Sequence, residues 1–519
     1  MARDQGVVVD PSARVPWWRF SGWGVPSSPG AVRPRDLAVG LLAALAIWYH
    51  VDVARRGRVD PVHPEWHMTD FTVFTEAGAA LFDGRDPYAV TNPRGWFYLY
   101  PPLFALMVAP LAALDPVSQV FAWYVTSVAL GFGCAWEVRR LERWVRADPS
   151  GEIAPSPLRT WIAVCGGLAV LWPTLECLQR GQLGIALLFA LLLGYRLAVT
   201  GESWGHRFLG GLALAWAATV KLVPVLPAAF VVWQFAALVL RPGRARGDFG
   251  RASAVASGVA TGGLLFVLVI PSAFLGWTVN LRHLRTWSDK VVTNADPGRQ
   301  SGFHLDSASN QSLANAAHSL AIRLRPVGPD DPRRVYQMFA RTPAEQGWAR
   351  DRAVAELRRA DHGTRWLVRA AQGVVVTLLV CLAFIPRKGC RAAEAAAFGL
   401  SCSATLLISP VAWTHYFMML LPATLAVPLY LAARDRPTAA KLLAAAPVVL
   451  VWSHYLARHQ VGSLGLLGLG TAAWFLSCGV VLAVERVRPA RPAGHHAPAR
   501  PAHHYARSPG TRKSKSQLA

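Results

Sequence analysis

The strongest constraint on the fold of this chain is a series of long apolar runs separated by short basic segments. Leu37 to Val51, Ser253 to Leu275 and Leu464 to Val484 are three such runs, each flanked by Arg or Lys. An α-helix crosses the hydrocarbon core of a bilayer with about 20 apolar residues. The sequence therefore predicts an all-α polytopic membrane protein.

The composition agrees with this class. Only 16% of the residues are charged, against about 25% in soluble globular proteins. The net charge is +23, but much of the excess lies in loops and in the tail, where basic residues indicate membrane orientation before a polyanionic partner. A cytosolic enzyme and a nucleic-acid-binding protein are both disfavoured. The seven cysteines have no paired spacing, so we expect neither a disulfide framework nor a metal site.

The charges of the loops predict the topology. From a cytoplasmic N-terminus rich in Arg, twelve spans place both ends of the chain inside. The cytoplasmic segments 139–159, 241–251, 387–391 and 434–441 are then basic, and so is the tail, as the positive-inside bias requires. The predicted spans lie near residues 37–52, 117–137, 161–178, 182–199, 207–221, 223–240, 253–275, 366–385, 391–409, 413–432, 439–457 and 464–484.

The chain thus divides into three predicted parts. Residues 1–36 form a cytoplasmic segment, residues 37–485 a multi-span domain, and residues 486–519 a basic, disordered cytoplasmic tail. Two long loops of the multi-span domain, 53–116 and 276–365, lie on the outer side. Loops of this length in a compact protein are usually functional or disordered, so we expect the functional site near them.

One apolar run does not fit the twelve spans. Counting Phe97 to Leu114 as a span would place the Arg-rich segment 139–159 outside. We interpret the run as an interfacial or re-entrant helix, with Trp96, Tyr98 and Tyr100 at the level of the lipid headgroups.

Several polar side chains beside the spans could carry chemistry. Asp70 can act as a general base toward an acceptor hydroxyl; a helix N-cap or a surface acid is the alternative. Lys221 interrupts an apolar stretch, and a lysine at membrane depth costs about 2.5–3.5 kcal/mol, which favours a function such as phosphate binding. Its alternative is snorkelling to the interface. His415, taken alone, is more typical of a structural residue.

These side chains share one property, which is that all of them map to the outer face in the predicted topology. A carboxylate, amides and cations at the membrane surface predict a site for a lipid-linked phosphate whose attached group is transferred outward. The residues concerned are Asp70, Gln182, Lys221, Asn310, Gln311, Arg323 and His415.

Five sequence elements, in this order, resemble those of actinobacterial members of glycosyltransferase family 87, which are multi-span enzymes of the GT-C type. They cover most of residues 37–432. The elements are Asp70-Phe-x-Val-Phe with Gly-Arg-Asp-Pro-Tyr88 and Tyr-Pro-Pro102, then Gly181-Gln182, Lys221-Leu-Val-Pro224, Asn310-Gln-Ser-Leu313 and Ser409-Pro-x-x-Trp-x-His415.

The resemblance implies a GT-C fold of about twelve transmembrane helices, and transfer of a sugar from polyprenyl monophosphate to a lipid or glycan acceptor. The sugar would be mannose or an arabinose-like sugar, and the best-described relatives are α-1,2-mannosyltransferases. The resemblance further implies an inverting reaction on the extracytoplasmic side of the plasma membrane, with Asp70 as base and no cofactor. Lys221, Arg323 and His415 would contact the donor phosphate. Substrate contacts would come from Gln182, Asn310, Gln311, Tyr88 and Tyr100.

A polytopic transporter or a flippase for lipid-linked sugars is the alternative function. Transporters often contain paired halves with broken helices at matching positions, whereas Lys221 to Pro227 has no clear counterpart in the second half of the chain. The chain contains no Asp-x-Asp pair, which gives little support to a metal-dependent mechanism with a nucleotide sugar.

Overall fold

The computed structural model describes residues 47–148, 156–240, 246–292, 309–324, 361–384, 390–458 and 464–487. Within these ranges the regular structure is helical, apart from two isolated antiparallel bridges, Thr91 with Phe97 and Asn310 with Trp413. The predicted cytoplasmic segment 1–36, and the predicted tail beyond its first two residues, lie outside the described residues.

All eleven spans predicted after residue 100 coincide with helices. Of the first predicted span, 37–52, only the part from residue 47 is described, and it belongs to a helix over residues 47–56. The eleven helical segments are α4 (Pro116–Arg146), α5 (Ser156–Arg180), α6 (Gly184–Thr200), α7 (Trp204–Val220), α8 (Val225–Val239), α9 (Arg246–Leu264) with η3 (Leu265–Val269) and α10 (Ile270–Leu275), α15 (His362–Phe384), α16 (Arg391–Ile408), η7 (Thr414–Leu420) with α17 (Leu421–Ala433), α18 (Pro437–Leu456) and α20 (Leu466–Val487).

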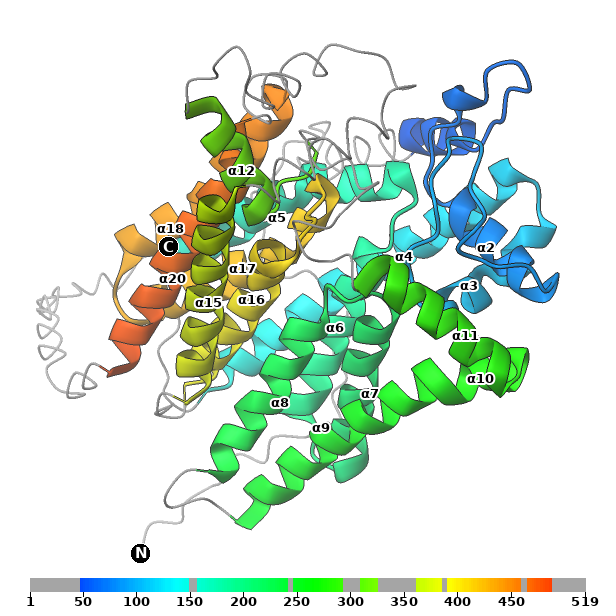
Figure 1. Ribbon diagram of the computed structural model, residues 1–519. Helices are drawn as coiled ribbons and strands as arrows, with labels where there is room; N and C mark the ends of the chain where they lie inside the picture. Colours follow the sequence, from blue (N-terminus) through cyan, green and yellow to red (C-terminus); the bar gives the residue numbers. More distant parts are fainter. Residues whose placement is uncertain are drawn as a thin grey trace, which may run out of the picture.

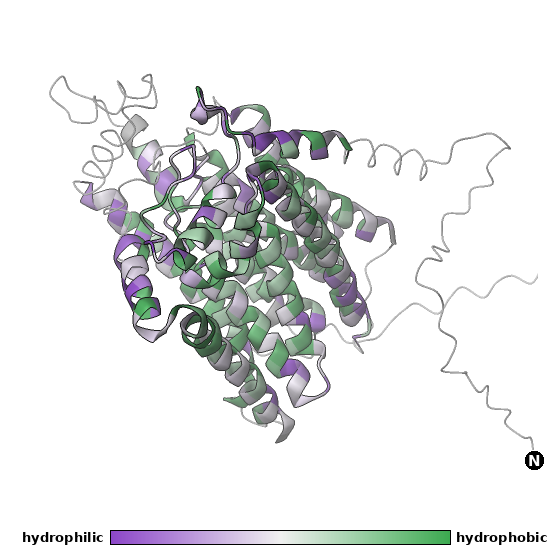
Figure 2. Cartoon of the chain, turned by 90° about the vertical axis from the view of Figure 1, so that its right-hand side faces the viewer, coloured by the Kyte–Doolittle hydropathy of each residue, from purple (hydrophilic) through white to green (hydrophobic). Residues whose placement is uncertain are grey.

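Seven helical segments in the described part of the chain are long and apolar enough to cross a membrane: α4, α5, α9 to α10, α15, η7 to α17, α18 and α20. Hydrophobic residues run along the helices, and hydrophilic residues gather toward their ends (Figure 2). The protein is therefore a multi-pass membrane protein. The twelve predicted crossings are not confirmed, because helices such as α6 and α8, with 17 and 15 residues, are shorter than the usual span of about 20 residues.

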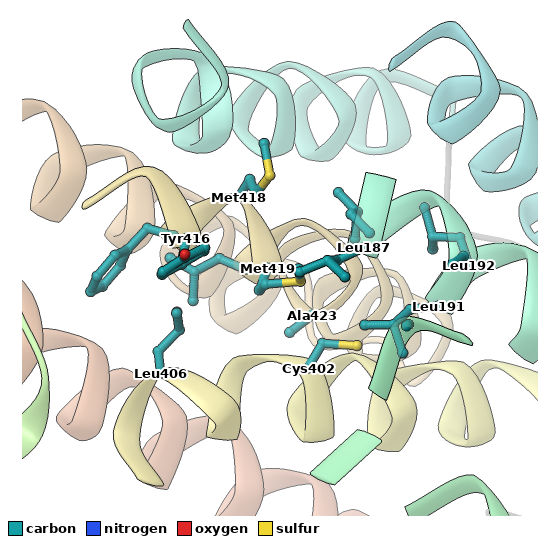
Figure 3. Close-up of a cluster of buried hydrophobic side chains, with 14 of the residues drawn as sticks. Leu187, Leu191, Leu192, Cys402, Leu406, Tyr416, Met418, Met419 and Ala423 are labelled. Carbon is teal, nitrogen blue, oxygen red and sulfur yellow. The ribbon is translucent and has the colours of Figure 1, made fainter. Parts of the chain in front are cut away.

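The helices pack in two groups (Figure 1), and their buried side chains form one apolar core. Helix α7 packs tightly against α9 because glycines face each other there: a Cβ atom on Gly258 would lie 2.2 Å from the Phe208 carbonyl oxygen. Side chains of α6, α16, η7 and α17 interlock in the core (Figure 3). At one side of this core the rings of Tyr195 and Phe398 stack with their centroids 3.9 Å apart.

The run 97–114 forms two short helices, α3 (Pro102–Val108) and η2 (Ala109–Ala113). They are too short to cross a bilayer, consistent with leaving this run out of the spans. Tyr98 and Tyr100 do not lie at the protein surface, and their place at the level of the lipid headgroups stays a prediction. They are buried, because Tyr100 packs edge-on against Phe74 and Phe104.

The two predicted outer loops contain helices and contact each other. The first loop holds η1 (Pro64–Trp66), α2 (Thr72–Phe82), α3 and η2, and the second holds α11 (Trp277–Trp287), η4 (Ser288–Val292) and α12 (Leu313–Leu324). Trp287 Nε1 donates to the Leu99 carbonyl at 3.3 Å, and Lys290 Nζ donates to the Tyr88 carbonyl at 3.0 Å. The second loop therefore braces the segment that carries Tyr100; its residues 293–308 and 325–360 lie outside the described ranges.

Candidate active site

Asp70 and Gln182 come together because α5 ends in a glycine turn. Gly181 has a φ of +66°, a left-handed conformation that glycine adopts without the steric cost a Cβ atom brings. A Cβ atom at Gly181 would lie 2.6 Å from the Cβ of Phe71. This close approach lets the Asp70 backbone N–H donate to the Arg180 carbonyl at 2.9 Å, and the Gln182 amide Nε2 donate to Asp70 Oδ2 at 2.9 Å. The two motifs are thus one structural unit.

The Gln182 amide continues a polar chain toward Lys221. Its Oε1 accepts from the Tyr100 hydroxyl at 3.5 Å, and Lys221 Nζ donates to the same hydroxyl at 2.8 Å. Burial raises the pKa of Tyr100. The phenol therefore stays protonated, and its hydroxyl both donates to Gln182 and accepts from Lys221. Lys221 lies between α7 and α8, and its Nζ sits 4.4 Å from the ring centroid of Tyr100 and 4.2 Å from that of Tyr416. The sequence predicts Asp70, Gln182 and Lys221 on one face of the membrane. The structure connects them by hydrogen bonds that pass through the Tyr100 hydroxyl.

Two arginines flank the Asp70 carboxylate. Arg94 approaches Oδ1 to 4.0 Å, and Arg180 approaches Oδ2 to 3.7 Å. Arg94 is held by a turn in which Asn92 Oδ1 accepts from the backbone N–H groups of Arg94 and Trp96, both at 3.1 Å. Asp70 Oδ1 is buried and accepts no hydrogen bond from the described part of the chain. One carboxylate oxygen is therefore balanced in charge but free of a hydrogen-bond donor.

A second buried carboxylate, Glu176, lies one turn before Arg180 on α5. It accepts from Arg180 Nε at 3.0 Å and from the hydroxyls of Thr414 and Tyr455. A guanidinium nitrogen of Arg458 lies 3.8 Å from Glu176 Oε1. Arg180 thus joins two carboxylates, and Glu176 ties the end of α5 to η7 and α18.

His415 follows Thr414 and is also buried. Its Nε2 finds no hydrogen-bond partner among the described residues, and its ring lies 4.3 Å from the ring of Tyr416, which Lys221 also contacts. The two chain neighbours of His415 therefore contact the two parts of the cluster: Thr414 donates to Glu176, and the ring of Tyr416 contacts Lys221.

Asn310 and Gln311 lie beside the same segment, and their side-chain oxygens serve the fold. Asn310 Oδ1 accepts from the backbone N–H groups of Ser312 and Ala412, both at 3.2 Å. Gln311 Oε1 accepts from the Gly468 N–H at 3.4 Å. These contacts hold the segment that precedes α12 against η7 and α20. The Nδ2 of Asn310 is buried and makes no hydrogen bond within the described ranges.

The remaining predicted site residues are Tyr88 and Arg323. The Tyr88 hydroxyl donates to the Tyr100 carbonyl at 3.0 Å, so Tyr88 supports Tyr100 from inside the protein. Arg323 belongs to α12, but its side chain lies outside the described part of the structure.

Four charged residues of the cluster were not predicted from the sequence: Arg94, Glu176, Arg180 and Arg458. A local signal existed only for Glu176 and Arg180, which form an i, i+4 pair directly before Gly181-Gln182 and close an otherwise apolar run. Arg94 and Arg458 are ordinary loop and helix-end cations in the sequence. Among the described residues, no group of three or more His, Cys, Asp or Glu side chains is arranged to hold a metal ion.

This arrangement suits attack by an acceptor hydroxyl on a sugar attached to an anion. Asp70 offers a free carboxylate oxygen that can take a proton. Lys221, Arg94, Arg180 and Arg458 outnumber the two carboxylates Asp70 and Glu176, so the cluster favours an added negative charge. Fixed cations in a site of low dielectric stabilise charge that develops on a leaving phosphate.

Comparison with known proteins agrees with this chemistry. Residues 98–410, more than half of the chain, match the model of glycosyltransferase family 87. The chain is 26% identical over 448 residues to the polyprenol-phosphate-mannose-dependent alpha-(1-2)-phosphatidylinositol mannoside mannosyltransferase of Mycobacterium tuberculosis, covering 82% of this chain and 87% of that protein. The protein of the same name from Mycolicibacterium smegmatis is 26% identical over 444 residues, covering 82% and 85%. No solved structure matches the chain.

Proposed function

Because the chain belongs to glycosyltransferase family 87, we propose that it transfers a mannosyl group from polyprenyl phosphate to a lipid or glycan acceptor. The names of both mycobacterial relatives give polyprenol-phosphate-mannose as the donor and a phosphatidylinositol mannoside as the acceptor. The alignments extend over more than four fifths of both partners, which supports the same class of donor here. The enzyme would be an α-1,2-mannosyltransferase.

One observation carries the catalytic part of the proposal: the polar chain from Asp70 through Gln182 and Tyr100 to Lys221. It holds a carboxylate with a free oxygen at one end and an amine at the other. A base and a phosphate-binding cation held apart in this way match a displacement in which the acceptor enters on one side and the phosphate leaves on the other.

The proposed reaction is a single inverting displacement. Asp70 takes the proton of the acceptor hydroxyl as that oxygen forms a bond to the anomeric carbon, and the bond from that carbon to the phosphate oxygen breaks with its electron pair. Polyprenyl phosphate leaves with the added negative charge, which Lys221 and His415, and Arg323 as a further candidate, stabilise. Gln182 holds Asp70 in the orientation needed for proton transfer.

The membrane placement is part of the same proposal. The predicted loop charges put Asp70, Lys221 and His415 on the extracytoplasmic side of the plasma membrane, with about twelve crossings of the GT-C type. The acceptor would then be a glycolipid or glycan of the cell envelope. Direct substrate contacts of Gln182, Asn310, Gln311, Tyr88 and Tyr100 stay predictions.

The test is replacement of Asp70 by Asn in the full-length protein, in membranes or detergent. We measure transfer of labelled mannose and release of polyprenyl phosphate from polyprenyl-phosphate-mannose. Loss of a general base lowers the rate by about 10²–10⁴-fold, while the isosteric amide preserves the packing. The matched control is Asp83→Asn in the same loop, because Asp83 is exposed and pairs with Arg85. Wild-type turnover by Asp70→Asn would refute the role of the carboxylate. Mannose movement without release of polyprenyl phosphate would instead indicate a transporter or flippase.

A further inference from the structure

Two buried polar nitrogens beside the candidate site have no hydrogen-bond partner within the described residues: His415 Nε2 and Asn310 Nδ2. The side chains of His415 and Asn310 are 2% and 0% exposed. Buried polar atoms without a partner are rare in folded proteins, because each loses its hydrogen bonds to water without replacement. Their presence points to a ligand that supplies acceptors.

The two nitrogens belong to segments that pair through their backbones. Asn310 forms an antiparallel bridge with Trp413, and the Thr414 N–H donates to the Ser309 carbonyl at 2.9 Å. His415 is the next residue in the chain. The two unpartnered groups thus come from neighbouring positions of one small structural unit.

Arg458 reaches the same unit from the end of α18. One of its guanidinium nitrogens donates to the Ser309 hydroxyl, and it lies 3.8 Å from Glu176 Oε1. Glu176 already accepts from Arg180, Thr414 and Tyr455. A guanidinium group carries five N–H donors, and the side chain of Arg458 is 31% exposed, so Arg458 has donors to spare for a ligand.

These three groups can all act as hydrogen-bond donors toward a ligand. Arg458 and the Asn310 amide nitrogen are donors only, and His415 Nε2 is a donor in one tautomer or when the ring is charged. Lys221 Nζ lies 4.2 Å from the ring of Tyr416, the residue that follows His415. Phosphate oxygens accept hydrogen bonds and carry negative charge, which complements such a set. Arg180 is already engaged by Asp70 and Glu176.

We propose that Arg458, together with Asn310 Nδ2 and His415 Nε2, binds the phosphate of the polyprenyl-linked donor. Arg458 is thereby assigned as a donor-phosphate contact, and the predicted substrate contact of Asn310 is with the phosphate. Glu176 is a positioning residue that holds Arg458 beside Ser309. The identity of the ligand rests on the proposed function.

The experiment measures equilibrium binding of polyprenyl phosphate, the leaving group, to the purified full-length protein in detergent micelles. Polyprenol, which lacks the phosphate, is the matched ligand. Asn310→Asp keeps the oxygen that accepts from Ser312 and Ala412 and replaces the unpartnered donor by a negative oxygen. Arg458→Gln removes a charge-assisted hydrogen bond, and Arg458→Lys restores the charge. Lys441→Gln, at an exposed position of α18, is the control.

We expect Arg458→Gln to weaken binding of polyprenyl phosphate by about 10-fold to 100-fold, and Asn310→Asp to weaken it at least as much. Arg458→Lys should recover part of the affinity, and binding of polyprenol should be the same in all variants. Wild-type affinity of both Asn310→Asp and Arg458→Gln for polyprenyl phosphate would overturn this inference while leaving the proposed function intact. Absence of polyprenyl phosphate binding by the wild-type protein would overturn the proposed function as well. If Arg458→Gln does not fold, Asn310→Asp decides the matter by itself.

Discussion

Replacement of Gly181 by Ala should damage the site without touching a charged group. Gly181 ends α5 with a φ of +66° and lets the following Gln182 reach Asp70. An alanine in this conformation costs about 1–2 kcal/mol because its Cβ approaches the neighbouring carbonyl. The added Cβ would also lie 2.6 Å from the Cβ of Phe71 and 3.1 Å from the Thr69 hydroxyl.

Those contacts cannot be relieved by rotating a flexible side chain, because the nearest atom is a Cβ attached directly to the backbone. Overpacking of this kind costs about 1–3 kcal/mol, so the total destabilisation is about 2–5 kcal/mol. The clash is relieved when the Phe71 segment moves away from α5. This movement lengthens the hydrogen bond from Gln182 to Asp70. A displacement of about 1 Å at a catalytic group can lower the rate about 100-fold.

The assay combines thermal unfolding of the purified protein with the rate of mannose transfer. Gly167→Ala on the same helix is the control, because a Cβ there meets nothing within 4 Å, and we expect it to be neutral or to stabilise by at most about 1 kcal/mol. Gly181→Asn separates the two costs, since Asn tolerates the left-handed backbone but keeps the clash. Unchanged stability and transfer rate in Gly181→Ala would show that this turn does not position Gln182.

Two further predictions concern single charged side chains. Lys221→Met removes the ammonium that contacts the Tyr100 hydroxyl, and we expect a higher KM for the lipid-linked donor and a lower kcat; steady-state kinetics equal to wild type would contradict a phosphate role. Glu137→Gln breaks the buried ion pair between α4 and α6 and leaves Arg196 without its counter-charge. We expect a loss of about 3–5 kcal/mol, measured as a lower unfolding temperature, with a modest effect on transfer by the folded fraction.

The positions of the helices after residue 100 can be predicted closely from hydropathy. Each run predicted as a span after residue 100 became a helix, because an apolar segment in a bilayer must satisfy its own backbone hydrogen bonds. The structure of the apolar run 97–114 is harder to predict from the sequence. Its composition alone does not distinguish a helix at a lipid surface from two short helices whose neighbouring tyrosines, Tyr98 and Tyr100, are buried by packing.

The sequence also singled out Asp70, Gln182, Lys221 and His415 as polar residues beside apolar runs on one predicted face. It gave no reason to connect residues 112 positions apart, as Asp70 and Gln182 are. That connection depends on one backbone turn at Gly181 and on the packing of α5 against the first outer loop.

From the sequence one can therefore predict the helical, membrane-spanning class and several of the polar residues that the structure gathers into one cluster. Which charges meet depends on the packing of distant segments: Arg94 and Arg180 approach Asp70, and Arg458 approaches Glu176. The difference lies in the distance along the chain over which each kind of interaction acts. Hydropathy and turn chemistry act over a few neighbouring residues, whereas an ion pair between α5 and the end of α18 exists only once the helices between them have packed.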